Sequence, residues 1–413
     1  MVDFRHRVGF TTWDLIFGSV VGALAGAASA LFLRLLEGTI ALRGRHLWLL
    51  FLLPLFGLIS AWLYHRFGKE AEGGGSLILD EVLEFKGRVP SRMAPMVLIG
   101  TLLTHLGGGS AGREGTAVQM GASLARTVGK LPWAWLHITH ARQRLLLMAG
   151  VSAGFGSLFG TPVAGALFGM EVIAIGKFHY EGLVICGVSS IVGDLVCRGL
   201  GAHHVEYFVQ ALPLTFGLGL RLLLFALPVA LVGGVFSEFA HGLARQTKAW
   251  FKGQWYLRPL LGGLVLLALH GLFRDAGYLN LGLPWLGRIF QAGVAVPPWA
   301  FALKVLFTCV TLGFGFKGGE VTPLFVIGAL LGATLAPLFG LPTTYLAAVG
   351  FIAIFAAASN TPLASTVMGI ELFGIGFIVP LSITCFLAYV LVGHRGIYGG
   401  HRVHTPKPGH PHP

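Results

Sequence analysis

The stretch TPVAGALFGMEV, residues 161–172, recurs in altered form as TPLASTVMGIEL at residues 361–372. Both begin with Thr-Pro, continue through small and apolar residues, and place a glutamate ten positions after the threonine, at Glu171 and Glu371. The two copies lie 200 positions apart. Similarity at such a spacing indicates that the chain contains two copies of one structural unit.

A second pair of similar stretches supports this duplication. GREGTAVQMG at 112–121 and GGEVTPLFVIG at 318–328 each place a glutamate two residues before a threonine. These residues are Glu114 with Thr116, and Glu320 with Thr322. The offset is 206, and the two motifs keep the same order along the chain. The sequence therefore predicts duplicated halves, over about residues 10–200 and 215–393.

The composition is that of a membrane protein. Of 413 residues, 55% are hydrophobic and only 11% are charged, whereas a soluble domain carries about 25% charged residues. Several apolar runs reach the roughly 20 residues with which a helix crosses a bilayer. The full set of apolar runs spans 13–33, 47–64, 145–176, 216–236, 259–273, 321–339 and 346–370. We predict an all-α, polytopic membrane protein embedded in the lipid bilayer.

Basic residues exceed acidic ones by twelve and gather in short connections between the apolar runs. This is the pattern of cytoplasmic loops under the positive-inside rule. It predicts a multi-pass protein of the cell inner (plasma) membrane with a cytoplasmic N-terminus. Nucleic acid is not an expected partner, because no recognition module accompanies the basic clusters.

The duplication favours a transporter, since such proteins bind their substrate where two repeats meet. Glycine-rich stretches at 73–75, 107–115 and 313–319 interrupt the apolar segments. At membrane depth, irregular backbone is tolerated where it lines a cavity or is buried in protein. The free N–H groups at the following helix starts would form an anion site, and a glutamate carboxylate could occupy that site as an anion mimic.

Glu114 is the strongest candidate for a functional residue, because a carboxylate at membrane depth is costly and usually functional. The alternative is a structural ion pair with Arg113. Adjacent residues on a helix do not face each other, so we expect no such pair. Arg113 is instead expected to support the loop by bonding its carbonyl groups.

Glu320 and Thr322 precede Pro323, a residue favoured in the first turn of a helix. Thr322 could be a plain helix cap, with Glu320 complementing the helix dipole. The repeat and the membrane location favour a functional reading. Thr322 would donate a hydrogen bond to an anion, and Glu320 would exchange a proton or an anion.

Other carboxylates have less distinctive settings. Glu171 and Glu371 follow runs of small residues that allow close helix packing. They could carry protons, but structural support at helix ends is an equally good interpretation. Asp80 and Glu81 are expected to face an aqueous vestibule.

One motif suggests an enzyme. GGSAG at 108–112 matches the Gly-x-Ser-x-Gly elbow of serine hydrolases, and His105 lies close to Ser110 in the sequence. That elbow needs a preceding strand and an acid that orients the base, whereas this segment is glycine-rich and apolar, with Glu114 soon after it. An intramembrane hydrolase is therefore the out-of-class alternative. We expect no enzyme activity, no cofactor and no metal site.

Four motifs together resemble the CLC family of anion channels and proton-coupled antiporters. They are GREGT, GTPVAGALFGMEV, GGEVTP and GHRGIY, and the resemblance spans about residues 10–400. It implies a homodimer with a separate anion path in each subunit, and repeats of inverted topology with broken, partly spanning helices. Glu114 matches the family's external gating glutamate. Tyr398 matches the tyrosine that lines the central anion site.

Departures from the usual motifs resemble the fluoride-exporting branch of the family. Thr116 replaces the usual proline, and Val321 replaces a phenylalanine between Glu320 and Thr322. The serine of the first motif falls on Gly75, with Ser76 beside it. The inner proton glutamate of chloride antiporters falls on Val172. The expected anion-binding residues are Gly75, Ser76, Gly115, Thr116, Val321, Thr322 and Tyr398.

These observations predict a secondary transporter that exports fluoride in exchange for protons, with Glu114 and Glu320 as the gating and proton-transfer residues. A chloride/proton antiporter and a passive halide channel are the alternatives within the same fold. The expected organisation is an N-terminal segment (1–12), a first membrane repeat (13–200), a linker (201–215), a second membrane repeat (216–393), and a C-terminal segment (394–413) holding Tyr398 and a disordered His- and Pro-rich tail.

Overall fold

The structure is a computed structural model. It describes residues 2–131, 138–205, 207–291, 294, 296–399 and 401–410, with the backbone alone for residues 2–10. These residues form helices and irregular segments, with isolated β-bridges and no β-strand among them. The expected all-α class is confirmed.

The helices fall into two sets along the chain. The first half contains α1 (Val2–Arg45), α2 (Leu53–Phe67), α3 (Gly74–Leu83), α4 (Met93–Leu106), α5 (Glu114–Lys130), α6 (His140–Phe159), α7 (Pro162–Glu171) and α8 (Leu183–Gly199). The second half contains α9 (Phe216–Trp250), α10 (Leu257–Phe273), α11 (Leu283–Phe290), α12 (Ala300–Gly313), α13 (Val321–Phe339), α14 (Thr343–Ser359), α15 (Pro362–Phe373) and α16 (Ile378–Leu391). Short 3-10 helices cover Leu47–Leu52, Lys69–Ala71, Tyr180–Gly182, Ala276–Tyr278 and Ile375–Phe377.

Five helical segments of the described chain are long and apolar enough to cross a membrane. They are Thr11–Arg45, Leu47–Phe67, Tyr180–Gly199, Phe216–Trp250 and Val321–Phe339. Six shorter apolar helices accompany them. The chain is therefore a multi-pass membrane protein in which full spans are combined with partial ones.

Two of the predicted apolar runs are broken rather than continuous. The run 145–176 divides at Gly160, and the run 346–370 divides at Asn360. Both residues adopt the left-handed conformation, with φ of 72° and 61°. A threonine and then a proline follow each of them, so a new helix starts at once. The same break in both halves is structural evidence for the duplication.

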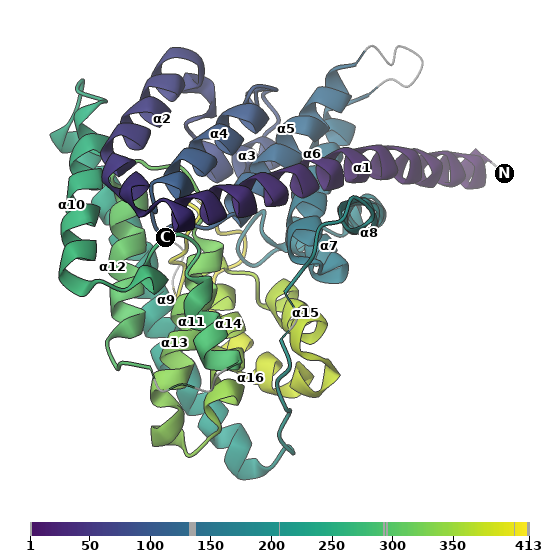
Figure 1. Ribbon diagram of the computed structural model, residues 1–413. Coiled ribbons are helices and arrows are strands. Elements are labelled where there is room, and N and C mark those ends of the chain that lie inside the picture. The colour runs from purple at the N-terminus through teal and green to yellow at the C-terminus, as the bar shows by residue number, and fades with distance from the viewer. Residues whose placement is uncertain are drawn as a thin grey trace.

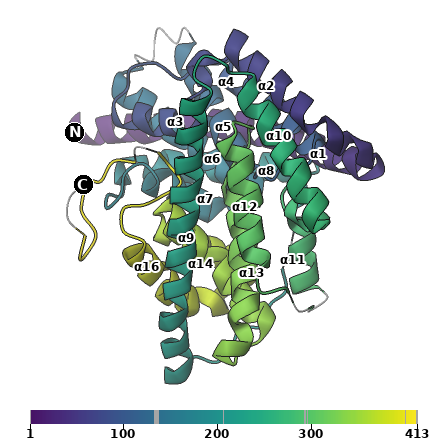
Figure 2. The same cartoon turned by 90° about the vertical axis from the view of Figure 1, so that its left-hand side faces the viewer.

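Most helices of the first half lie in the upper part of the molecule in Figure 1 and most of the second half in the lower part, while α10 reaches up beside α2. Within each half, glycines bring equivalent helices into backbone contact. A Cβ atom on Gly121 of α5 would lie 2.1 Å from the carbonyl oxygen of Gly150 in α6. A Cβ atom on Gly328 of α13 would likewise lie 2.1 Å from the carbonyl oxygen of Gly350 in α14. This is the small-residue packing typical of membrane helices. Figure 2 shows α9, α12 and α13 aligned along the second half.

The halves meet where α7 packs on α15, and two glutamates join them reciprocally. Glu171, at the end of α7, accepts the N–H groups of Leu363 and Ala364 at 3.0 and 2.7 Å. Glu371, in α15, accepts those of Val163 and Ala164 at 3.0 and 2.8 Å. Each glutamate therefore caps the other half's helix and satisfies N–H groups that a helix start leaves free. These contacts correspond to the structural role, support at helix ends, that the sequence offered for Glu171 and Glu371.

The C-terminal segment is packed against the protein, so the predicted disordered tail is wrong for residues 401–410. Ile175 exchanges backbone hydrogen bonds with this segment, donating to Arg402 and accepting from His404, both at 2.9 Å. The buried ammonium of Lys407 donates to the carbonyl of Tyr389 at 2.6 Å, and also to Asn360 and Gly393. The prolines exclude a helix, but a buried cation holds the chain in place. Residues 411–413 lie outside the described residues.

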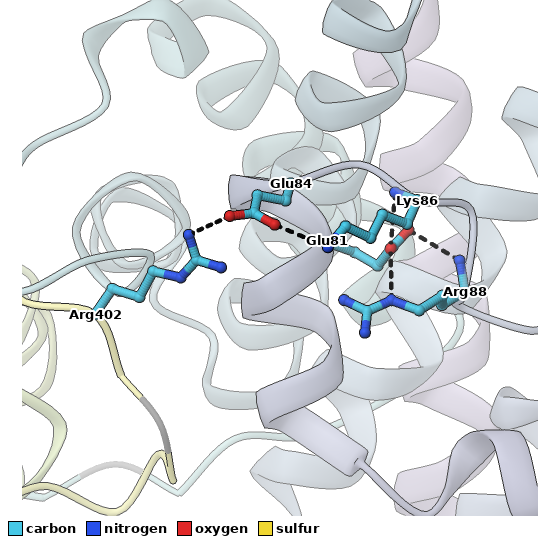
Figure 3. A network of polar contacts seen from close by, with 5 residues as sticks. All are labelled: Glu81, Glu84, Lys86, Arg88 and Arg402. Carbon is cyan, nitrogen blue, oxygen red and sulfur yellow. Dashed lines mark hydrogen bonds and ion pairs between the residues drawn. The ribbon is translucent and has the colours of Figure 1, made fainter.

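Carboxylates at the end of α3 secure this part of the molecule (Figure 3). Glu84 forms an ion pair with Arg402 at 2.6 Å. The hydrogen bond from Arg402, and to a smaller extent the one from Lys86, lowers the pKa of Glu84 to about 2. Glu81 is buried and accepts the backbone N–H groups of Lys86 and Arg88 at 2.9 and 3.0 Å. The prediction that Glu81 faces an aqueous vestibule was therefore wrong, because the turn after α3 folds over its carboxylate.

Candidate functional site

The two glycine-rich loops identified in the sequence lie side by side. Gly112 donates its N–H to the carbonyl of Gly319 at 2.6 Å, and Gly319 donates to Gly112 at 2.9 Å. A Cβ atom on Gly319 would lie 2.8 Å from the backbone nitrogen of Gly115. The pairing therefore requires glycine at this position, and it places the starts of α5 and α13 next to each other.

The carboxylate of Glu114 lies at the N-terminus of α13. It accepts two hydrogen bonds from Thr322, one from the backbone N–H at 2.9 Å and one from the side-chain hydroxyl. A further bond comes from the N–H of Arg113 at 3.1 Å. Glu114 is fully buried. Its carboxylate is therefore held as a bound anion would be, by backbone and hydroxyl donors at a helix start.

Arg113 differs from its predicted role. Its Nε lies 3.7 Å from Oε1 of Glu114, and none of its side-chain nitrogens bonds a loop carbonyl of the described residues. The expectation that these neighbours do not pair was wrong. Arg113 is the residue before the helix, outside its regular geometry, so the spacing rule for helix faces does not apply to the pair.

A cavity of about 370 Å³ lies beside Glu114, between the two halves. Its lining includes seven of the predicted site residues, namely Gly75, Ser76, Glu114, Gly115, Glu320, Val321 and Tyr398. Gly75 is next to the tyrosine, and a Cβ atom on it would lie 3.8 Å from the Tyr398 ring. Segments from residues 64 to 399 therefore converge on one small chamber.

Glu320 supplies a second carboxylate to this cavity. Its side chain makes no hydrogen bond or ion pair with another residue in the described part of the chain. It interacts electrostatically with Glu114, and both carboxylates interact with the phenol of Tyr398. One carboxylate is thus fixed by donors, while the other has no hydrogen-bonding partner on another described residue.

Thr322 and Thr116 lie behind the cavity wall rather than on it. The donor groups of Thr322 are both directed to Glu114, so an anion would reach them only after the carboxylate moves. Thr116 instead pairs its hydroxyl with that of Thr101 in α4, at 2.7 Å. Its position in the repeat is equivalent to that of Thr322, but its side chain points to the neighbouring helix.

Several lining residues were not identified from the sequence. They are Tyr64, Gln119, Phe155, Phe168, His241, Arg258 and Lys317, among others. Lys317 could have been identified as a site residue from the sequence, because a cation directly before the GGEVT motif is unusual at membrane depth. The phenylalanines could not, since 31 of them are spread over the chain.

Val172 is buried at the end of α7 and does not line the cavity. The nearest candidate carboxylate in the sequence, Glu171, is committed to capping α15. The position that the family resemblance connects with an inner proton carrier therefore offers no titratable side chain.

The hydrolase alternative is contradicted by the surroundings of Ser110. Its hydroxyl pairs with Thr308 at 2.9 Å and accepts from the buried ammonium of Lys304 at 2.9 Å. Neither ring nitrogen of His105 bonds to Ser110. A serine nucleophile needs a base within hydrogen-bond reach. His105 makes no such contact, and the ammonium of Lys304 also donates to the carbonyls of Tyr278 and Asn280, which hold it as a structural cation.

Comparisons with known proteins agree with this architecture. The family model described as voltage gated chloride channel matches residues 56–393. A chloride/fluoride channel protein of Pseudomonas syringae pv. tomato is 43% identical over 407 residues, which cover 97% of this chain and 88% of the relative. An H(+)/Cl(-) exchange transporter of Yersinia pestis is 28% identical, over 92% of this chain and 85% of the relative.

Solved structures give the same result. A crystal structure of a CLC-type fluoride/proton antiporter matches with a TM-score of 0.90 and 34% identity, covering 95% of this chain and 98% of that one. A slow cyanobacterial Cl-/H+ antiporter matches in fold, with a TM-score of 0.76 at 21% identity. This chain belongs to the CLC family, the family of voltage gated chloride channels.

Proposed function

We propose that this protein is a secondary transporter that exports fluoride in exchange for protons. The observation that carries the proposal is the pair of carboxylates at one cavity, with Glu114 held by Thr322 at the start of α13 and Glu320 free beside it. The similarity to a CLC-type fluoride/proton antiporter supports it.

The chemistry of the site suits fluoride. A small, strongly hydrated anion must exchange its water for short, charge-assisted hydrogen bonds. Protonation of Glu114 removes its negative charge and weakens its hold on the donors of Thr322. Those donors, with the phenol of Tyr398, then become available to fluoride. Glu320 lies in the same cavity and can pass the proton onward without entering the helix N-terminus itself.

The remaining features of the proposal concern assembly and membrane placement. We place the protein in the inner (plasma) membrane with a cytoplasmic N-terminus, because its basic residues gather in the connections predicted to be cytoplasmic. A homodimer is proposed from the family, with one complete cavity in each subunit. The division into an N-terminal segment, two repeats, a linker and a C-terminal segment is retained as a proposal.

Flux measurements on purified protein in liposomes test the function. An imposed fluoride gradient is expected to drive proton movement against its own gradient, and a chloride gradient is expected to do so weakly. Fluoride flux without proton movement would instead indicate a passive channel. Chloride-driven proton movement at the higher rate would indicate a chloride/proton antiporter.

Thr322→Ala is expected to weaken fluoride binding and selectivity. The substitution removes one hydroxyl donor, worth about 1.5–3 kcal/mol to a charged partner, or roughly tenfold to hundredfold in affinity. The ratio of fluoride to chloride flux in liposomes measures the change. Thr322→Ser keeps the hydroxyl and should retain most of the selectivity.

Thr116→Ala is the matched control, because it removes the equivalent hydroxyl from the first repeat, where the partner is Thr101 rather than Glu114. Its selectivity should stay near that of the wild type. If Thr322→Ala kept the wild-type preference, Thr322 would be a helix cap and no more.

A further inference from the structure

A histidine of α9, His241, lines the cavity that contains the paired carboxylates. It shares this lining with Glu114, Glu320 and Tyr398, and no other histidine of the described residues contributes to it. Histidine is the side chain whose ordinary pKa allows a change of charge near neutral pH. The cavity therefore holds, beside its two carboxylates, a group that can take up and release a proton.

The hydrogen bond of His241 determines which ring nitrogen carries the proton. Nε2 lies 3.0 Å from the carbonyl oxygen of Ile397, the residue before Tyr398. A carbonyl oxygen can only accept, so Nε2 is the donor, and Nδ1 of the neutral ring carries the lone pair. Nδ1 makes no hydrogen bond with a described residue and is not fully enclosed by the protein. It can therefore accept a proton while the bond to Ile397 is kept.

Charged groups surround the ring on several elements. On α9 itself, Glu238 and Arg245 interact with His241 electrostatically, about one turn to either side. Glu238 is also paired with Arg395 of the C-terminal segment, at 3.5 Å. The other charged or titratable groups of the cavity are Glu72, Glu114, Arg258, Lys317, Glu320 and Tyr398. The ring thus has buried carboxylates in its cavity and exposed charges on its own helix.

His241 lies toward the end of α9 that we assign to the cytoplasmic side. Arg245, Lys248 and Lys252 follow it and lead into the turn between α9 and α10, and such clusters remain in the cytoplasm under the positive-inside rule. A second cavity of about 530 Å³ extends to this turn and shares lining residues with the first, among them the exposed Glu72. A proton on His241 is therefore close to a route to the cytoplasm.

We propose that His241 is the inner proton-transfer residue, which receives a proton from Glu320 and releases it to the cytoplasm. The proposal rests on the proposed function and adds a residue to its proton route. The O–H bond of Glu320 breaks and leaves a carboxylate, while an N–H bond forms at Nδ1 and gives the imidazolium. The transfer crosses the cavity directly or through one water.

Release of the proton completes the cycle of the ring. The imidazolium gives the Nδ1 proton to water on the cytoplasmic side, which becomes hydronium, and the neutral ring is restored. The N–H of Nε2 stays on Ile397 throughout. The loop that carries Tyr398 therefore keeps its place while the proton passes.

The first test is His241→Gln in liposomes, with proton movement driven by a fluoride gradient. Glutamine can donate an amide N–H to the carbonyl of Ile397, as Nε2 does, but it cannot take up a proton. Proton movement is expected to fall about 100-fold, the scale of a lost proton-transfer group, with thermal stability near that of the wild type. The matched control is His65→Gln, because His65 is exposed, stacks on Trp255 and does not line the carboxylate cavity. It should keep the wild-type proton flux.

His241→Glu separates proton transfer from a structural role. An ionised carboxylate cannot donate to Ile397, but it can carry a proton. This variant should recover proton movement relative to His241→Gln, with its pH dependence shifted toward lower pH, since the ordinary pKa of Glu is about 4.3 and that of His about 6.5. A side chain that only held Ile397 would give the opposite result, with His241→Gln active and His241→Glu inactive.

The outcomes distinguish this proposal from the proposed function. Proton flux in His241→Gln within tenfold of a coupled wild type would overturn the role of His241 alone. A wild type that moved fluoride without protons would instead contradict the proposed function. If chloride drove the protons, the same variants measured with chloride would still test His241. If His241→Glu fails to fold, His241→Gln, which keeps the bond to Ile397, decides the question.

Discussion

Glu114→Gln is expected to abolish proton-coupled exchange, with proton movement driven by a fluoride gradient reduced about 100-fold or more, the scale of a lost proton-transfer group. Glutamine has the size of the protonated acid but cannot carry a proton. It can still accept the N–H of Thr322 through its amide oxygen and donate to the Thr322 hydroxyl, so the fold should be retained. Liposome assays that follow fluoride and pH together measure the result.

The control is Glu171→Gln, which removes a buried carboxylate from the end of α7. Glu171 caps α15 and does not line the paired-carboxylate cavity. This variant should therefore lose some thermal stability while keeping coupled exchange. Intact fluoride-driven proton transport in Glu114→Gln would remove Glu114 from the proposed mechanism.

Glu320→Gln is expected to uncouple protons from fluoride or to slow turnover, again with the fold intact. Glu320 lines the cavity and interacts electrostatically with Glu114, and its carboxylate has no hydrogen-bonding partner on another described residue. Loss of this carboxyl should lower the number of protons moved per fluoride, about 100-fold if it is the sole inner carrier. The same two-ion flux assay in liposomes gives this ratio.

Glu320→Ala should have the same effect as Glu320→Gln, which would exclude a consequence of side-chain size. The Glu171→Gln variant again reports what loss of a structural carboxylate does. If Glu320→Gln exchanged fluoride for protons at the wild-type rate while Glu171→Gln did not, the second carboxylate would have to be Glu171.

The sequence predicted those features that depend on repetition. Similar motifs at offsets of 200 and 206 indicated two halves, and two glycine-rich loops carrying Glu114 and Glu320 indicated a shared site. The structure brings these loops together through Gly112 and Gly319. Such predictions succeed because loops at equivalent positions of two related repeats are brought near the axis that relates them.

Side-chain direction was harder to predict. Thr116 and Thr322 occupy equivalent places in their repeats, yet one bonds Thr101 and the other bonds Glu114. The difference depends on which helix packs beside each loop, and spacing along the chain does not record it. Lys407 is a similar case, because its acceptors come from Asn360, Tyr389 and Gly393, which only the folded helices bring together.

The reciprocal glutamate caps make folding of the first half depend on synthesis of the second half. Val163 and Ala164 leave the ribosome about 200 residues before Glu371, the carboxylate that receives their N–H groups. At roughly 5–20 residues per second, the first repeat waits about 10–40 s for this partner. The beginning of α7 is then an open helix end in a newly made membrane segment. Translation of the second half must therefore reach Glu371 before the first half can complete its own fold.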